Sequence, residues 1–381
     1  MSTLRGFKVR LTQIAYSEYE NLPTYWKLHP MGLQDINLIV GRNASGKSRT
    51  LNVINGLAQF LMGRSAPSDG NFEFDFESSN GKKHSYSLRV QEKEVTEEVF
   101  TSDGIKLLDR GKGGFGKIHI SQFNEFIDFQ AAPNTLAANT RNDIVQHPFL
   151  KPLIDWAERL YYYPCTTDLG KSALMLKHPD RPPVDPRDSR QTTGVLKSGI
   201  QQFGDEFINS VLDDMRAVGY DLSEVGVMAP RTVQVFGPAE AESVYVLESG
   251  IPAKIDQFAM SVGMFRALAI IIHLNFGIRS SAADSVLIDD IGEGLDFDRS
   301  SSLIKLIVKK VKESSLQVIM TTNDRYVMNG IPVDYWSVLD RKGAEVSSYN
   351  IFNRKDAFEE FKFTGLSNFD FLSRDFLSTG K

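Results

Sequence analysis

One eight-residue segment narrows the folds open to this chain more than any other. It runs Gly41-Arg42-Asn43-Ala44-Ser45-Gly46-Lys47-Ser48 and fits the pattern G-x-x-x-x-G-K-[ST]. An apolar run at 36–40 precedes it and predicts a buried strand, and apolar residues with helical spacing follow it at 51–57. A strand, a glycine-rich turn and a helix in this order predict an α/β fold built on a P-loop. A chance match in an unrelated loop is the alternative, and the flanking elements argue against it.

The motif supplies what a phosphate group needs. Its glycines let the backbone approach the ligand without a Cβ clash, and its successive N–H groups and the following helix N-terminus attract an anion. We expect Lys47 to reach the β- and γ-phosphates of a nucleotide and the Ser48 hydroxyl to bind Mg²⁺.

Composition places the chain among ordinary globular proteins. Its 381 residues are 41% hydrophobic and 24% charged, with a net charge of −5, which argues against a binder of nucleic acid that is basic over its whole surface. Cys165 is the only cysteine, so neither a disulfide framework nor a cysteine-based zinc site is expected. The N-terminus lacks the apolar core of a signal peptide, and the apolar stretch 267–274 is too short to span a bilayer. A cytoplasmic protein without membrane contact is expected.

Alternating residues over 71–100, interrupted by Asn80-Gly81, predict an antiparallel hairpin. Residues 143–163 read as mostly helical. The stretch 171–197 is rich in proline and holds six Lys or Arg against three Asp. It predicts a solvated loop or crossover, with a contact to nucleic acid or to another protein as the alternative. The phenylalanine-rich tail at 351–381 is expected to pack on the chain's own core, with partner docking as the alternative.

A second motif ends in paired carboxylates. Residues 285–288 form an apolar strand pattern, and Asp289-Asp290 follow it directly. After a P-loop, this arrangement is typical of a Walker B motif, in which Asp289 binds Mg²⁺ and the next carboxylate polarises the attacking water. Here that next residue is Asp290 instead of glutamate. Solvated acids at a strand end are the alternative reading.

Three further segments surround this pair. Ser261 and Gly263 open a helical pattern upstream of it and look like a degenerate ABC signature, although a simple helix N-cap serine is the alternative. Residues 294–299 stand where a D-loop would be. The strand pattern at 318–322 ends at Asn323, where a switch histidine is usual.

In this order, the five elements resemble the ABC-type ATPases of the SMC/RecF/overcoming-lysogenization-defect group. Within that group the chain is most similar to the compact ATPases of prokaryotic anti-phage systems such as PARIS, Septu and Gabija. The resemblance covers nearly the whole chain and implies an α/β fold: an ABC-type P-loop ATPase head with a mixed sheet core, an antiparallel β subdomain, a helical lid and no long coiled coil. It implies a single head over 1–381 with four parts. An N-terminal β lobe with the P-loop covers 1–130, and a helical lid insertion, which includes the loop 171–197, covers 131–255. The signature, Walker B and switch segment covers 256–350, and the tail covers 351–381.

The resemblance also assigns roles for ATP and Mg²⁺. Ser48 and Asp289 would hold the metal, the 41–48 loop with Arg49 would hold the nucleotide, and Ser261 with Gly263 would close over ATP bound to a second subunit. Asp290 would position water, with Glu293 as its backup, and Asn323 would contact the γ-phosphate. A glutamine that contacts the nucleotide is expected after the first lobe, where Gln130 and Gln122 both qualify. An aromatic residue that stacks on adenine is expected near the N-terminus, where Tyr16 and Tyr19 qualify.

Two departures from the family pattern predict slow ATP turnover. Asp290 is one methylene shorter than glutamate, and Asn323 cannot shuttle a proton as histidine does. Losing well-placed acid–base help costs about 10²–10⁴-fold in rate.

Absent features suggest the partners. The sequence has no heptad repeat, no room after Asn323 for a toprim nuclease and no histidine cluster. The chain is therefore expected to act on itself as a homodimer or larger oligomer and on a separately encoded effector, with a phage protein or DNA as trigger. A RecF-like DNA-metabolism ATPase is the main alternative. A transporter subunit and a binding module with a dead ATPase are the others.

Overall fold

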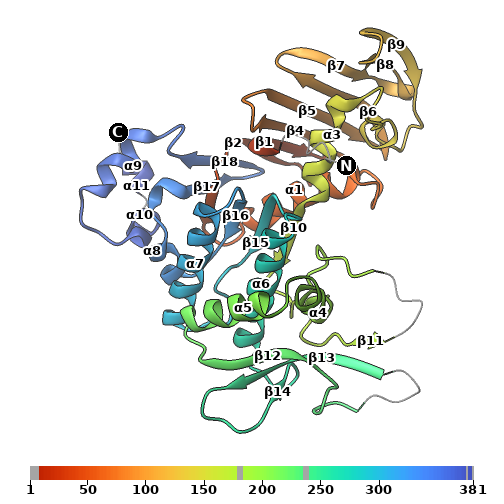
Figure 1. The fold of residues 1–381 in the computed structure, drawn as a ribbon. Coiled ribbons are helices and arrows are strands. Elements are labelled where there is room, and N and C mark those ends of the chain that lie inside the picture. Colours follow the sequence, from red (N-terminus) through yellow and green to blue (C-terminus); the bar gives the residue numbers. More distant parts are fainter. Residues whose placement is uncertain (1–7, 178–182, 235–239, 375, 380–381) are drawn as a thin grey trace. The chain divides into compact units, whose positions relative to one another are not determined.

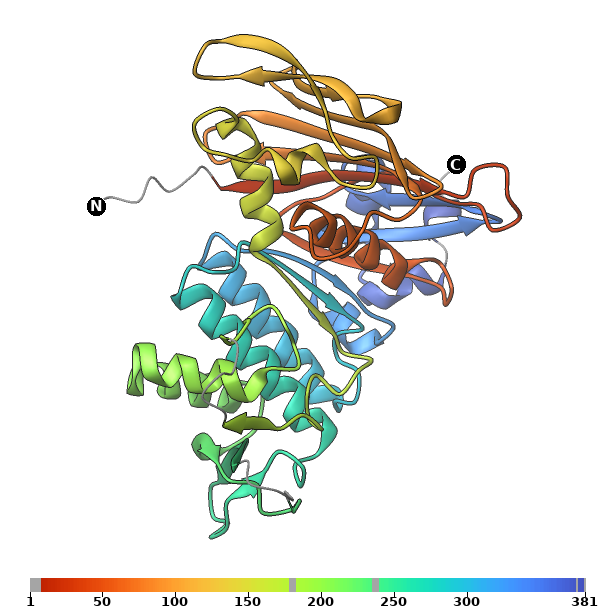
Figure 2. The same cartoon turned by 90° about the vertical axis from the view of Figure 1, so that its right-hand side faces the viewer.

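The computed structural model describes residues 8–177, 183–234, 240–374 and 376–379. The chain folds into two compact units (Figures 1 and 2). The first unit joins the two ends of the chain, Met1–Leu160 and Val333–Lys381, and the second is the middle, Tyr161–Pro332.

The first unit is built on a mixed sheet in the order β3-β17-β18-β2-β1-β4-β5-β6-β7-β8-β9. Its strands are β1 (Val9–Glu18), β2 (Trp26–Gly32), β3 (Ile36–Gly41), β4 (Gly70–Ser78), β5 (Lys83–Gln91), β6 (Glu94–Ser102), β7 (Ile105–Arg110), β8 (Phe115–Ile120), β9 (Glu125–Gln130), β17 (Trp336–Lys342) and β18 (Glu345–Asn350). Its helices are α1 (Lys47–Leu61), α2 (Ala137–Thr140), α3 (Lys151–Glu158), α9 (Lys355–Lys362), α10 (Asn368–Ser373) and α11 (Phe376–Thr379).

Strands β4 to β9 form an antiparallel meander. The predicted Asn80-Gly81 turn joins β4 to β5, with Glu77 opposite Lys83 and Gly81 at φ 83°, a conformation that favours glycine. Directly opposed apolar side chains cross this sheet from strand to strand, and we call them the apolar row: Ile14, Phe74, Tyr86, Phe100, Leu108 and Ile118. All six are buried. The row therefore forms the core of the lobe.

The C-terminal helices pack on the first unit, as the sequence predicted. Phe358, Phe361 and Phe371 are buried, and the Phe371 ring lies 6.4 Å from that of Trp336 on β17. Figure 1 shows α9, α10 and α11 gathered in one cluster. The tail is thus part of the unit that carries the P-loop.

The second unit contains the strand order β10-β15-β16 and a small separate sheet, β11-β13-β12, with β14 paired to β13. Its strands are β10 (Leu160–Pro164), β11 (Met175–Lys177), β12 (Leu222–Met228), β13 (Glu240–Glu248), β14 (Ile255–Asp256), β15 (Ser285–Asp289) and β16 (Gln317–Thr321). Its helices are α4 (Thr192–Phe203), α5 (Asp205–Ala217), α6 (Val262–Arg279), α7 (Phe297–Lys312) and α8 (Arg325–Gly330). Figure 2 shows α4, α5, α6 and α7 lying together in this unit.

Helix α6 is long and apolar enough to cross a membrane, with a mean hydropathy of 1.4 over 18 residues. However, 78% of it is buried inside the protein, where it packs on α4 and α5. It is the core helix of the second unit.

The fold class is as predicted. The architecture is mixed α/β with an antiparallel β subdomain, and within the described ranges the longest helix is α6, so no long coiled coil is present there. The helix expected over 143–163 is wrong at both ends, because α3 covers only Lys151–Glu158: a 3-10 turn at Pro148–Leu150 precedes it, and β10 follows from Leu160. Buried Tyr161 and Tyr163 explain the strand, since aromatic side chains suit a half-buried strand.

The proline-rich stretch 171–197 is only partly described, because residues 178–182 lie outside the described ranges. In the rest, Arg187 pairs with Asp185, and Arg190 pairs with Asp188. Its remaining described lysines also have protein partners: Lys171 bonds to the Phe258 carbonyl, Lys177 pairs with Glu240, and Lys197 pairs with Glu242. These contacts favour the solvated loop over a nucleic-acid contact.

Candidate nucleotide site

The P-loop connects β3 to α1 through two backbone conformations of positive φ. Ala44 has φ 61° and Gly46 has φ 105°. A Cβ on Gly46 would lie 2.9 Å from Cζ2 of Trp26, so both the backbone angle and the lack of space require glycine there. Strand β3 is buried along its whole length and parallel to β17, which fixes where the loop begins.

The P-loop side chains face the loop itself. The Lys47 ammonium is buried and donates to the carbonyl oxygens of Gly41 at 3.0 Å and Arg42 at 3.3 Å. The Ser45 hydroxyl is buried, and among the described residues it has no hydrogen-bond partner. Ser48 lies in the first turn of α1 and is half-exposed. The Lys47 ammonium, the buried Ser45 hydroxyl and the N-terminus of α1 therefore lie together in the P-loop.

Arg49 is held by the neighbouring strands. Its guanidinium pairs with Glu18 at the end of β1 and lies 4.4 Å from the ring centre of Trp26 on β2. These contacts tie the start of α1 to both strands. Its predicted role at the nucleotide remains a prediction.

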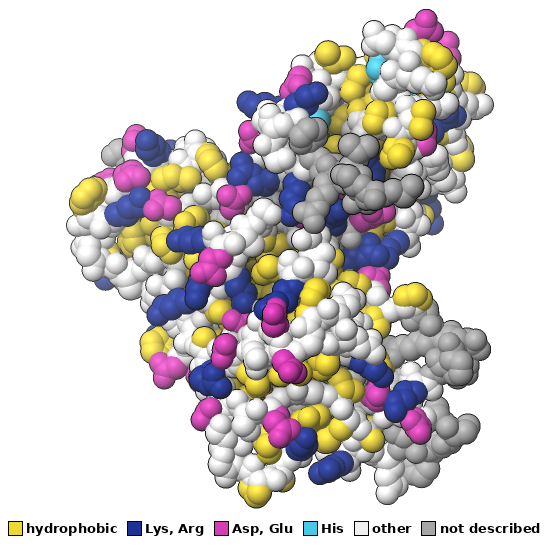
Figure 3. Space-filling model, in the orientation of Figure 1, with side chains coloured by type: hydrophobic (Ala, Val, Ile, Leu, Met, Phe, Trp, Pro, Cys, Tyr) yellow, Lys and Arg dark blue, Asp and Glu magenta, His cyan; other side chains and the backbone are white. Residues whose placement is uncertain are grey.

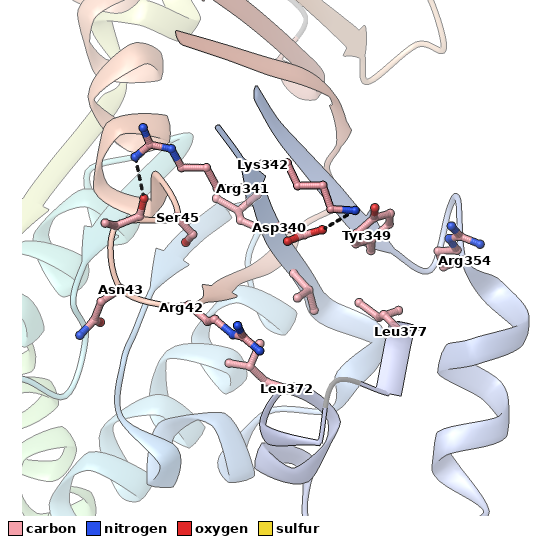
Figure 4. A pocket seen from close by; sticks show the side chains of 13 residues that line it. Arg42, Asn43, Ser45, Asp340, Arg341, Lys342, Tyr349, Arg354, Leu372 and Leu377 are labelled. Atoms are coloured by element: carbon pink, nitrogen blue, oxygen red, sulfur yellow. Dashed lines mark hydrogen bonds and ion pairs between the residues drawn. The ribbon is translucent and has the colours of Figure 1, made fainter. Parts of the chain in front are cut away.

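Arg341 was not predicted from the sequence, yet it contacts the P-loop. It lies on β17, and its Nη1 donates to the Ala44 carbonyl at 3.0 Å, while its Nε donates to the Gly343 carbonyl at 2.8 Å. Figure 4 shows this contact beside a cavity of about 830 Å³. The charged or aromatic side chains lining it include Arg42, Asp340, Arg341, Lys342, Tyr349 and Arg354. The flank of the P-loop is thus mainly basic.

Two sequence predictions in the first unit need correction. Tyr16 is buried against Trp26 and Phe72, and burial raises its pKa to about 12, so its ring cannot stack on a base. Tyr19 is exposed in the β1–β2 turn and remains the candidate.

The second correction concerns Gln130. It lies on β9, ten strands from β3 in the sheet order, and donates to the Gly113 carbonyl at 3.4 Å. Gln122 lies in the turn between β8 and β9, equally remote in that order. Neighbouring strands are about 4.8 Å apart, so neither glutamine reaches its own P-loop.

In the second unit, the predicted Walker B strand is β15. It is fully buried and parallel to β16, and Asp289 at its end is buried. The Thr321 hydroxyl on β16 donates to Asp289 Oδ1 at 2.6 Å, and the Cys165 amide donates to the Asp289 carbonyl at 2.9 Å. Backbone and side chain of Asp289 are therefore both fixed.

The three predicted catalytic carboxylate and amide groups of this unit lie together. Asp290, Glu293 and Asn323 all line one hollow of about 300 Å³. Asn323 Nδ2 donates to Asp290 Oδ1 at 3.1 Å, and the Asp290 amide donates to Thr321 Oγ1 at 2.8 Å. Asp290 has φ 52°, a region in which aspartate is better tolerated than glutamate, which gives a backbone reason for the shorter side chain.

The signature segment begins α6. Ser261 is the N-cap residue, and its hydroxyl accepts from the Met264 amide at 3.1 Å, as the N-cap alternative requires. Ser261 and Val262 are exposed, while Gly263 is buried so closely against Gly294 that a Cβ would overlap the Gly294 carbonyl oxygen. The helix start therefore packs on the expected D-loop.

Arg266 links this helix to the Walker B loop, and the sequence did not indicate it. Its Nη1 donates to the Glu293 carbonyl at 2.9 Å, and its Nε and Nη2 donate to the Thr167 carbonyl at 3.2 and 3.1 Å. Nearby, burial raises the pKa of the Cys165 thiol to about 12, which keeps it protonated and unreactive.

Residues 36–329 match the model of the family described as "AAA domain, putative AbiEii toxin, Type IV TA system". The chain belongs to this family. The matched segment of this AAA-family protein begins at β3 and ends in α8, so it contains the segments predicted as P-loop, signature, Walker B and switch.

Solved structures show the same fold. The head domain of Smc from Pyrococcus furiosus, with an extended coiled coil and bound to the C-terminal domain of ScpA, has a TM-score of 0.53 and 13% identity, covering 93% of this chain and 100% of that chain. An SmcHead bound to the C-winged helix domain of ScpA has a TM-score of 0.51 and 13% identity, covering 92% and 99%. No curated protein matches the chain. The AAA-family chain thus has the fold of an SMC head domain.

Proposed function

We propose that this AAA-family chain binds ATP with Mg²⁺ and hydrolyses it slowly. The hollow that brings together Asp290, Glu293 and Asn323 is the observation that supports hydrolysis. The Lys47 ammonium and the unpaired Ser45 hydroxyl suit phosphate, and the Ser48 hydroxyl and Asp289 carboxylate are the oxygen ligands that Mg²⁺ prefers. When bound, the metal would neutralise charge on the phosphates.

Slow turnover follows from the side chains in the hollow. Asp290 would orient the attacking water and accept its proton, but its carboxylate is already bonded to the Asn323 amide. Asn323 can donate to a phosphate oxygen but cannot accept and release a proton. We expect a rate below about 10 s⁻¹, the median for enzymes.

We further propose that ATP joins two copies of the chain. Ser261 and the first N–H groups of α6 would contact the γ-phosphate held by the partner's P-loop, because a helix N-terminus attracts anions. The exposure of Ser261 and Val262 at the start of α6 supports this role. Because Arg266 on α6 donates to the Glu293 carbonyl, a movement of α6 on binding the partner's ATP would also move the loop that follows β15.

The biological role that we propose is a sensor and scaffold in a prokaryotic anti-phage system, with a separately encoded effector. The family description names a toxin of a toxin–antitoxin system, and both similar SMC heads were solved with a domain of a separate protein, ScpA. Both the family description and the bound ScpA domains support an ATPase head that works together with a second protein.

The test is the native mass of the tagged chain purified from its host in Mg-ATP, compared with an Asp290→Asn variant. The variant keeps an oxygen that can accept from Asn323 but loses the charge, so it should bind ATP, fail to hydrolyse it and accumulate as a dimer. A Lys47→Ala variant should bind no ATP and remain a monomer.

The outcomes separate the alternatives. A dimer that retains a stoichiometric second protein supports the sensor role, and a wild-type monomer in ATP contradicts the sandwich. Hydrolysis stimulated by DNA and strongly weakened by salt would favour the RecF-like alternative.

A further inference from the structure

The β lobe of the first unit ends in a strand without an outer neighbour. Strand β9 is last in the sheet order, and among the described residues β8 is its only strand partner. Residues 125–128 are exposed. Because only one edge of β9 is paired, the backbone N–H and C=O groups of its outer edge are open to another strand.

The apolar row of this lobe continues into β9. Ile127 lies directly opposite Ile118, the last buried member of the row, but 41% of its surface is exposed. The cross-strand partner that covers each earlier member of the row on its outer side is lacking here. One more strand, with an apolar residue opposite Ile127, would complete the row.

The other face of β9 is apolar as well. Phe126 points to the opposite face from Ile127, because side chains alternate along a strand, and it is 51% exposed. Figure 3 shows hydrophobic side chains gathered where Figure 1 places β8 and β9. The strand has no proline, no lysine and no register shift, three devices that commonly protect an edge.

The charges on β9 indicate the kind of strand that fits. Glu125 and Asp128 are its charged residues, and among the described residues neither forms an ion pair. In an antiparallel pairing of two copies centred between Phe126 and Ile127, Glu125 of each copy would face Asp128 of the other, and like charges in opposed positions destabilise a sheet. The two acids therefore disfavour a second copy and favour a basic strand.

We propose that the outer edge of β9 binds a β-strand of a partner protein in which two adjacent apolar residues are flanked on each side by lysine or arginine. One apolar residue lies opposite Ile127 and extends the apolar row, the other lies opposite Phe126, and the flanking basic residues lie opposite Asp128 and Glu125. This inference rests on the proposed function only in assuming a separately encoded partner; it does not require nucleotide.

The test uses fluorescein-labelled peptides of about strand length and measures their fluorescence anisotropy with the full chain. One peptide carries Lys-Val-Val-Lys at its centre, a second replaces both of these lysines with glutamate, and a third replaces alternate residues of the first with proline. We expect the lysine peptide to bind about tenfold more tightly than the glutamate peptide, since two opposed charge pairs change sign. The proline peptide should not bind, because it lacks backbone donors.

Variants locate the site. Ile127→Lys should abolish binding of the lysine peptide, and the double variant Glu125→Lys, Asp128→Lys should reverse the peptide preference. Ile105→Lys is the matched control, because Ile105 is an equally apolar residue, 62% exposed, on β7. Unchanged thermal melting and ATP turnover in these variants separate failure of this inference from failure of the proposed function.

Three results would overturn the proposal. They are equal affinity for the two charged peptides, equal loss with Ile105→Lys and Ile127→Lys, and a wild-type dimer in sedimentation that Ile127→Lys dissociates. The last result would assign the edge to a second copy of the chain.

Discussion

The Thr321 hydroxyl donates to Asp289 Oδ1 over 2.6 Å between the ends of two parallel strands. The oxygen of this Thr321 hydroxyl also accepts from the Asp290 amide at 2.8 Å. A single hydroxyl therefore sets the positions of both acids at the end of β15. Asp289 and Thr321 are both buried, so an unmade hydrogen bond to the Asp289 carboxylate is costly.

Replacing this hydroxyl should therefore destabilise the protein and impair hydrolysis together. Thr321→Val has nearly the same shape but leaves Asp289 and the Asp290 amide without their partner, and we expect a loss of about 1.5–3 kcal/mol in the free energy of unfolding. Urea unfolding and ATP turnover check this. Thr321→Ser keeps the hydroxyl and should retain most of both; if it fails as badly as Thr321→Val, the hydroxyl is not the cause.

Arg341 is expected to position the P-loop for nucleotide. Arg341→Ala removes the donor to the Ala44 carbonyl, and we expect ATP affinity to fall by about tenfold, the equivalent of about 1.4 kcal/mol. Isothermal titration with ATP measures the change. Lys342→Ala removes the same charge from the same cavity but has no P-loop bond, so equal losses in the two variants would show that only charge matters.

Two helical glycines should respond oppositely to alanine. At Gly56 in α1 the nearest atom to a new Cβ is Phe60 Cζ at 4.0 Å, so Gly56→Ala should stabilise by about 0.5–1 kcal/mol. Gly263→Ala would overlap the Gly294 carbonyl and should destabilise by about 1–3 kcal/mol. Thermal and urea unfolding of both variants test the pair, and stabilisation by Gly263→Ala would refute the close packing of α6 on the D-loop.

Stability should fall in mild acid because of His273. Burial lowers the pKa of this histidine to about 4 from an ordinary value of 6.5, while its Nδ1 bonds to the Pro186 carbonyl at 3.0 Å. The unfolded chain takes up a proton at this histidine below about pH 6.5, but the folded chain does so only near pH 4. The free energy of unfolding is therefore unaffected by His273 above pH 6.5 and decreases as the pH falls from 6.5 towards 4.

At pH 5 this linkage amounts to about 2 kcal/mol. Urea unfolding at pH 7.5 and 5 measures it, and His273→Gln should flatten the pH dependence by that amount. A wild-type slope that survives His273→Gln would assign the acid sensitivity to other groups.

Short-range patterns predicted most of the elements that carry the site. The P-loop lies between β3 and α1 as expected, and β15 and β16 lie where apolar strand patterns were found. These signals succeed because a buried strand and an amphipathic helix each leave a local trace in the sequence.

Contacts between distant segments left no such trace. Arg341 lies 297 positions along the chain from Ala44, and nothing in the residues around it indicates that contact. Gln130 was chosen by its position after the first lobe, but the number of intervening strands decides its distance from the P-loop. Tyr16 failed for a related reason, since alternation alone did not tell which face of β1 is buried.

The chain order of the first unit imposes a sequence of events during synthesis. Strand β3 carries the P-loop, but its parallel neighbour β17 and the clamp from Arg341 belong to the last part of the unit, after the whole of 161–332. A ribosome-bound chain that has emerged only through Pro332 therefore lacks the strand that orders its phosphate loop. The chain would therefore become able to bind ATP only late in synthesis, once the middle unit is already outside the ribosome. A chain terminated before β17 would not bind ATP.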